Sequence, residues 1–123
     1  MPIEKIIQPN DEILKIATPI MDNLMAGATE RDWKKHTLNF TNGAKASLSE
    51  ENLLKQCDEY QSTYGYFAER EFVGITRHPK YVNIIWKQRM TESSGEYMAI
   101  LTLIQHDEEY FVIRCWVDLW EPN

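Results

Sequence analysis

The sequence predicts an α+β domain in which three N-terminal helices pack on a curved four-stranded antiparallel meander. Two observations lead to this prediction. Apolar residues recur at helical spacing as far as Gly65, and from Tyr66 onward the apolar period changes to two. Helices followed by consecutive strands are typical of a fold in which the helices cover one sheet face. With 123 residues, 43% of them hydrophobic, the chain has the size of a single domain over residues 1–123.

The first helix is expected to begin at Asn10 or Asp11, either of which can cap it, and to end at Gly27. Its apolar stripe consists of Ile13, Ile16, Ala17, Ile20, Met21 and Leu24. Pro19 lies inside this segment, and a proline there removes a backbone hydrogen bond. Because the stripe keeps its phase through the proline, we expect one bent helix.

Two more helices are expected before the strands. The second begins at the cap Thr29 and ends near Gly43, and it carries Trp33, Thr37 and Phe40. The third begins at the cap Ser49 and closes at Gly65, with a buried stripe of Leu53, Cys57, Tyr60 and Tyr64.

The four strands are expected near residues 66–77, 81–91, 97–106 and 110–120. Turn-forming residues mark the joints at His78-Pro79-Lys80, Ser93-Ser94-Gly95 and Asp107-Glu108. A two-residue turn at Pro79-Lys80, a three-residue loop at 93–95 and a two-residue turn at 107–108 then set the register. Under this register Ile75 pairs with Ile84, Glu71 with Gln88, Trp86 with Thr102, and Ile104 with Phe111.

This register predicts one almost entirely apolar sheet face, which must lie under the helices. Its members are Val73, Ile75, Val82, Ile84, Trp86, Met90, Met98, Ile100, Ile104, Phe111, Ile113, Cys115, Val117 and Leu119, with Gln88 and Thr102 as uncharged polar residues.

The opposite sheet face is also expected to carry a large apolar field mixed with arginine, which is typical of a protein–protein contact. We therefore expect a homodimer that associates through this face. The interface residues would be Leu101, Leu103, Val112, Arg114, Trp116 and Trp120. The alternative is a monomer whose long side chains cover the field.

Charge and composition exclude several classes of protein. Thirteen Lys and Arg against nineteen Asp and Glu give a net charge of −6, and the cations are scattered, so we expect no nucleic-acid partner. No apolar run approaches the roughly 18 residues that a membrane span needs. The N-terminus lacks the layout of a secretory signal, so we expect a cytoplasmic protein. Cys57 and Cys115 lack the spacing of a metal or redox motif, and no motif predicts a metal ion or another cofactor.

The phrases Ala26-Gly27-Ala28-Thr29, Leu48-Ser49-Glu50-Glu51 and Tyr64-Gly65, in this order before a meander, resemble the NTF2-like (cystatin-like, cone-shaped) superfamily. The resemblance covers nearly the whole chain and is closest to small bacterial domains of unknown function. It implies a conical cavity between the helices and the concave sheet, often with dimerisation through the other sheet face. Because this superfamily includes isomerases, dehydratases, transport factors and assembly domains, it does not imply one activity.

Within such a cavity we expect a small apolar ligand and the lining residues Tyr60, Tyr64, Trp86, Gln88, Met90 and Thr102. The histidines are expected to be structural or exposed, with His36 on a basic helix face. The expected function is a non-catalytic module that binds a ligand or a protein.

The alternative is a small-molecule isomerase or dehydratase resembling ketosteroid isomerase. Its candidate base is Glu71, which the predicted register places at the cavity mouth beside Gln88, where a carboxylate can abstract a proton. Glu71 would otherwise be solvated, or paired with Arg70 or Arg89.

Overall fold

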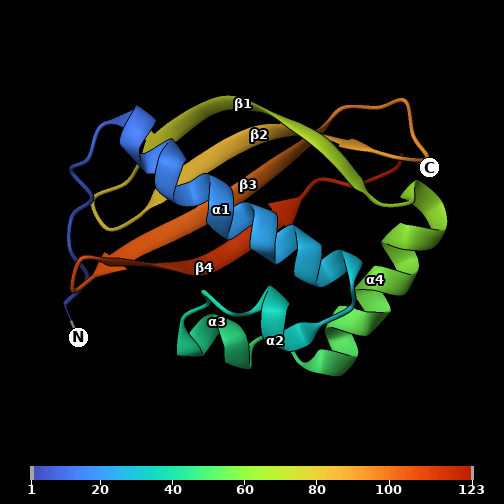
Figure 1. Cartoon of the computed structure of the whole chain (residues 1–123), viewed down its shortest axis with the longest axis horizontal. Coiled ribbons are helices and arrows are strands. Elements are labelled where there is room, and N and C mark those ends of the chain that lie inside the picture. The colour runs from blue at the N-terminus through green and yellow to red at the C-terminus, as the bar shows by residue number, and fades with distance from the viewer. Residues whose placement is uncertain (1, 123) are drawn as a thin grey trace.

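The structure is a computed structural model that describes residues 2–122. Four helices precede four strands, and the strands form one antiparallel sheet in the order β1-β2-β3-β4 (Figure 1). The predicted α+β class is therefore confirmed. The elements are α1 (Asn10–Thr29), α2 (Trp33–His36), α3 (Asn42–Ala46), α4 (Glu50–Tyr64), β1 (Phe67–Arg77), β2 (Val82–Met90), β3 (Tyr97–His106) and β4 (Glu109–Val117).

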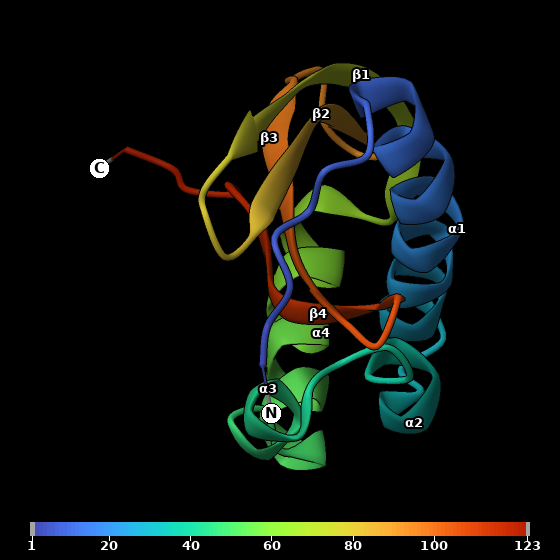
Figure 2. The same cartoon turned by 90° about the vertical axis from the view of Figure 1, so that its left-hand side faces the viewer.

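The long helix α1 lies along one face of the sheet, and α2 follows at its C-terminal end (Figure 2). As expected, α1 continues through Pro19 as one helix. It also continues beyond Gly27, the predicted stop, to Thr29. Gly27 has another role: a Cβ at this position would overlap the backbone of His36 in α2. The missing side chain therefore lets the two helices approach closely.

The predicted second helix is two short helices instead of one. Asp32 caps α2 by accepting a hydrogen bond from the Lys35 amide, and Thr41 caps α3 by accepting one from the Ala44 amide. Between them residues 37–39 form a turn, and Phe40 makes a single bridge to Val112 at the edge of β4. The Val112 amide donates to the Asn39 carbonyl over 2.7 Å, and the Thr41 amide donates to the Val112 carbonyl over 3.0 Å. The turn and this bridge interrupt the helix that the sequence predicts.

Helix α4 has the predicted boundaries. The Ser49 hydroxyl accepts a hydrogen bond from the Asn52 amide over 3.1 Å, which caps the first turn. Gly65 ends the helix with a φ of 78°, a conformation that glycine adopts at little cost.

Three of the predicted strand pairs test the turns. The two-residue turn Asp107-Glu108 is confirmed, with φ values of 51° and 64°, and Ile104 pairs with Phe111. Ile75 also pairs with Ile84 as predicted. The β2–β3 register is wrong, because Trp86 pairs with Ala99 and not with Thr102.

The connection between β2 and β3 explains this error. It spans the six residues 91–96, because the amides of Thr91 and Glu92 continue to hydrogen-bond to the carbonyls of Tyr66 and Tyr64. The β3 residues that pair with β2 are therefore displaced by three positions relative to the predicted register. An odd displacement exchanges the two faces of a strand.

Three bulges change the faces again. In β1 one extra residue lies between Phe67 and Arg70 and another between Phe72 and Gly74, and in β4 one extra residue lies between Val112 and Arg114. Each bulge inverts the face assignment of every residue on one side of it. The predicted faces are therefore correct along β2 but not along the whole of the other three strands.

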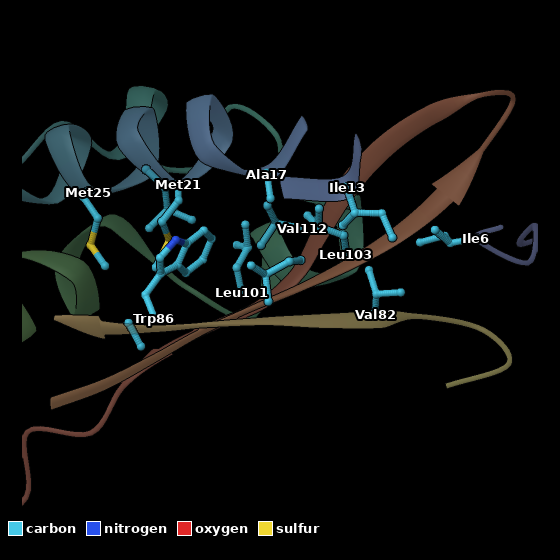
Figure 3. Packing of buried hydrophobic residues seen from close by; sticks show 13 residues of the cluster. Ile6, Ile13, Ala17, Met21, Met25, Val82, Trp86, Leu101, Leu103 and Val112 are labelled. Carbon is cyan, nitrogen blue, oxygen red and sulfur yellow. The ribbon is translucent and has the colours of Figure 1, made fainter. Parts of the chain in front are cut away.

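The core lies between α1 and the sheet (Figure 3). Ile13, Ala17 and Met21 of α1 are fully buried, and each large apolar side chain buried in this way stabilises the fold by about 1.5–3 kcal/mol. On the sheet side the buried residues are Val82, Ile84, Trp86, Ala99, Leu101, Leu103 and Val112. Pairing places Met98, Ile100, Ile104 and Phe111 on the opposite face, which corrects their predicted position under the helices.

Candidate ligand pocket

A pocket of about 860 Å³ lies between the C-terminal half of α1, the α2–α3 region, α4, and β4 with the residues that follow it. In Figure 1 these helical segments lie on the β4 side of the sheet. Leu24, Met25 and Ala28 line the pocket from α1, and Leu53 and Cys57 line it from α4. The wall is therefore apolar in part, and polar side chains such as Gln56 and Thr63 also line it.

Helix α2 places an imidazole at this pocket. His36 lines it, and its Nδ1 lies 2.8 Å from the Leu24 carbonyl. Because a carbonyl oxygen only accepts, Nδ1 donates this hydrogen bond and Nε2 of the neutral ring is left as an acceptor. Burial lowers the pKa of His36 below its usual value, although the bond to Leu24 opposes this effect. The ring is therefore neutral at physiological pH.

Helix α4 contributes a thiol and a phenol to the same wall. The Cys57 thiol donates to the Ala28 carbonyl over 3.3 Å, and the Tyr60 ring stacks on Phe67 with 4.9 Å between ring centroids. Burial raises the pKa of Cys57 and that of Tyr60, so both groups are neutral. The Tyr60 hydroxyl accepts a hydrogen bond from Gln61 Nε2 over 3.1 Å.

The segment after β4 borders the pocket and is held by Tyr64. The Tyr64 hydroxyl lies 2.8 Å from Glu121 Oε1 and 3.0 Å from the Leu119 carbonyl, and it donates its proton to this pair of acceptors. Burial, with the Glu121 carboxylate as the next cause, raises the pKa of Tyr64 to about 12. The phenol therefore remains a donor and keeps this segment against α4.

Cys115 of β4 also lines the pocket. Its Sγ lies 3.8 Å from Met21 Sδ, and burial raises the pKa of the thiol to about 12. Since the thiolate is the nucleophilic form, Cys115 is unreactive at neutral pH.

The structure brings two of the six predicted lining residues to this pocket, Tyr60 and Tyr64. Trp86, Gln88 and Met90 lie on the α1 side of the sheet as predicted. They are buried there but do not line this pocket. Gln88 Nε2 donates to the carbonyls of Ala68 and Arg89, so it supports the start of β1. Thr102 lies on the outer face instead, where its hydroxyl donates to Asn83 Oδ1 over 2.6 Å.

Glu71 does not lie at the pocket mouth, which corrects its predicted position. The bulge between Phe72 and Gly74 pairs Glu71 with Lys87 on the outer face. There its carboxylate lies 3.0 Å from Lys87 Nζ, and its side chain is 72% exposed. Arg70 occupies the inner position beside Gln88, stacked 5.4 Å from the Trp86 ring and paired with Asp22 of α1. The isomerase hypothesis therefore loses the carboxylate on which it depended.

The predicted dimer residues fall into two groups. Leu101, Leu103 and Val112 are fully buried in the core under α1, so their assignment to an interface is wrong. Arg114 and Trp116 do lie on the outer face, with Trp116 48% exposed, and Trp120 follows the strand at 74% exposure. The apolar residues now found on this face are Ile85, Met98, Ile100, Ile104, Phe111 and Trp116.

Sequence reasoning missed His36 as a pocket residue. Its neighbours Lys34 and Lys35 favoured a solvated helix face, but the imidazole turns toward Leu24. Gly27 carried a signal that could have indicated this, because a glycine within a continuing helical pattern can mark close packing of another backbone.

Two features are absent from the described residues 2–122. These residues contain no group of three or more His, Cys, Asp or Glu side chains that could hold a metal ion. Within the same residues, none of the helices combines the length and apolarity that crossing a membrane requires.

Comparison with known proteins supports the fold class. No family model matches the sequence, and no curated protein matches it. The structure of Bd1075 from Bdellovibrio bacteriovorus is similar, with a TM-score of 0.52 and 11% identity, over 92% of this chain and 42% of that one. This chain thus spans less than half the length of Bd1075. At such low identity the similarity concerns the α+β fold alone.

Proposed function

We propose that the chain is a cone-shaped, NTF2-like binding module that takes up a small apolar ligand in the pocket beside α4. The observation that carries the proposal is the pocket itself. A volume of about 860 Å³ is within the range of sites that hold drug-sized molecules. The order of elements, helices before a four-stranded meander, is consistent with the superfamily resemblance.

The protonated thiols of the wall favour binding over nucleophilic catalysis. His36, Cys57 and Tyr60 are neutral, and Cys115 is a protonated thiol, so the wall supplies hydrogen-bonding groups but no activated nucleophile. Such a wall can orient a ligand that enters mainly to remove apolar surface from water.

We further propose that two copies associate through the outer face of the sheet. Exposed Met98 and Trp116 lie there beside Ile100, with Arg114 next to them. Exposed apolar surface of this kind, mixed with arginine, is typical of an interface.

Native mass spectrometry of the freshly purified protein, followed by titration with the neutral fluorescent probe N-phenyl-1-naphthylamine, tests ligand binding. We expect either a retained small molecule or saturable binding of the probe. Gln56→Trp adds a large ring at the pocket wall. It should weaken probe binding by about tenfold, since the added ring occupies volume that the probe would fill.

Lys55→Trp is the matched control, because Lys55 is an exposed neighbour on α4 that does not line the pocket. It should leave probe affinity unchanged. An adduct-free protein that does not bind the probe would overturn the proposal, as would equal effects of the two variants.

A further inference from the structure

The charged side chains around the pocket are mostly acidic. Glu59 of α4 and the C-terminal residues Asp118 and Glu121 line it, whereas Arg114 is its one basic residue apart from the neutral His36. Arg114 pairs with Thr102, so strand alternation directs its side chain to the outer face beside Ile100 and Trp116. Carboxylates therefore outnumber permanently charged cations in the pocket lining by three to one.

Two of the carboxylates lie near Tyr64 at the end of α4. Glu121 is hydrogen-bonded to the Tyr64 hydroxyl, and the charges of both Glu121 and Asp118 contribute to the raised pKa of this tyrosine. Tyr97 adds a second aromatic ring there, edge-on to Tyr64 with 5.5 Å between centroids. Carboxylates beside aromatic rings are favourable surroundings for an ammonium group.

Apolar residues line another part of the pocket. Leu53 and Cys57 are buried there and Phe67 is partly buried, and His36 belongs to the same lining. A ligand with a charged head and an apolar body would place its head at Asp118 and Glu121 and bury its body among these residues.

We propose that the ligand is a cationic amphiphile, an amine carried on an aliphatic or aromatic body. This inference rests on the proposed function, since it names the chemical class that the same pocket selects. Charge complementarity selects against carboxylates and phosphates, which would meet Asp118 and Glu121 without a facing cation.

The test compares three probes that share one eight-carbon tail: n-octylammonium, 1-octanol and n-octanoate. Their affinities are measured at neutral pH by displacement of N-phenyl-1-naphthylamine. We expect octylammonium to bind about fivefold more tightly than octanol, the upper range for one partly exposed ion pair, and octanoate to bind most weakly. Raising the salt concentration should reduce the octylammonium preference alone.

The double variant Asp118→Asn, Glu121→Gln should abolish the preference and leave octanol binding unchanged, since both amides keep the size of the carboxylates. Glu50→Gln, Glu51→Gln is the matched control. It makes the same change in net charge in the first turn of α4, at residues that do not line the pocket.

Three outcomes would overturn this inference and leave the proposed function intact. They are equal binding of octylammonium and octanol, tighter binding of octanoate, and equal effects of the two double variants. Failure of all three probes and of N-phenyl-1-naphthylamine to bind would overturn both.

Discussion

His36 illustrates how the surroundings of one side chain set its chemistry. In the sequence it follows two lysines, which suggested an exposed position. In the fold its Nδ1 is held by the Leu24 carbonyl, and burial favours the neutral ring. The same hydrogen bond also connects α2 to α1, so the residue is structural as well as part of the pocket wall.

The lowered pKa of His36 predicts a pH dependence of stability. The unfolded state takes up a proton near the ordinary pKa of about 6.5, whereas the folded state takes it up only at lower pH. The folded state therefore loses stability as the pH falls from 7.5 through 6.5, until the folded-state pKa is reached. Urea unfolding of the wild type and of His36→Asn at pH 7.5 and 5.0 measures this, since asparagine can still donate to Leu24.

We expect the loss of stability between these pH values to be smaller in His36→Asn than in the wild type. His78→Asn, a change at an exposed turn histidine, is the control and should keep the wild-type dependence. An unchanged dependence in His36→Asn would show that other groups cause the acid sensitivity.

The contact between α1 and α2 shows what individual elements contribute. Helix α2 has only four residues, too few to be stable alone. It is held against α1 by the Asn23 side chain, which donates to the Lys35 carbonyl over 2.9 Å, and by the His36 bond to Leu24. Gly27 permits this close approach.

Gly27→Ala should therefore destabilise the protein, although alanine is ordinarily the better helix former. The added methyl group overlaps the His36 backbone, so α2 must move away at a net cost of about 1–3 kcal/mol. The free energy of unfolding in urea measures this cost. Gly43→Ala is the control, because a Cβ there meets no atom within 4 Å; it should gain up to about 1 kcal/mol from helix propensity. A Gly27→Ala variant as stable as Gly43→Ala would contradict the argument.

At the scale of the whole molecule, both faces of the sheet carry apolar residues. One is buried under α1, and the other carries exposed Met98 and Trp116. Stable dimers bury roughly 800 Å² on each partner, and a four-stranded face with exposed aromatic residues is a suitable surface for such a contact.

Trp116→Glu should convert the expected dimer into a monomer, since association would then bury an unpaired carboxylate. Light scattering coupled to size-exclusion chromatography at several concentrations measures the subunit number. Leu38→Glu, which also replaces an exposed apolar residue but lies outside the sheet, should leave the dimer intact. A monomeric wild type, or a Trp116→Glu variant that remains dimeric, would remove the outer face as the interface.

Part of the candidate site was predictable and part was not. Tyr60 and Tyr64 belong to the helical stripe of α4, and their position at the pocket follows from the period of that helix. The predicted position of Glu71 depends on strand alternation counted from the 79–80 turn. This alternation is interrupted by the bulge between Phe72 and Gly74. The position of His36 depends on a contact between two helices, for which Gly27 is the signal in the sequence.

Features that depend on neighbouring residues were predictable from the sequence. These include the α+β class, the boundaries of α4 at Ser49 and Gly65, and the two-residue turn at Asp107-Glu108. Capping and turn preferences act over three or four residues, so they can be read locally.

The face that each strand residue occupies and the location of the pocket depend on the tertiary structure. Side chains in a strand alternate with a period of two, so one bulge residue or an odd change in loop length exchanges the faces. The extra residues in β1 and β4 and the six-residue connection 91–96 moved Glu71 outward and Leu101 inward. The position of a bulge and the length of a loop depend on long-range contacts, and such contacts are outside the reach of local sequence patterns.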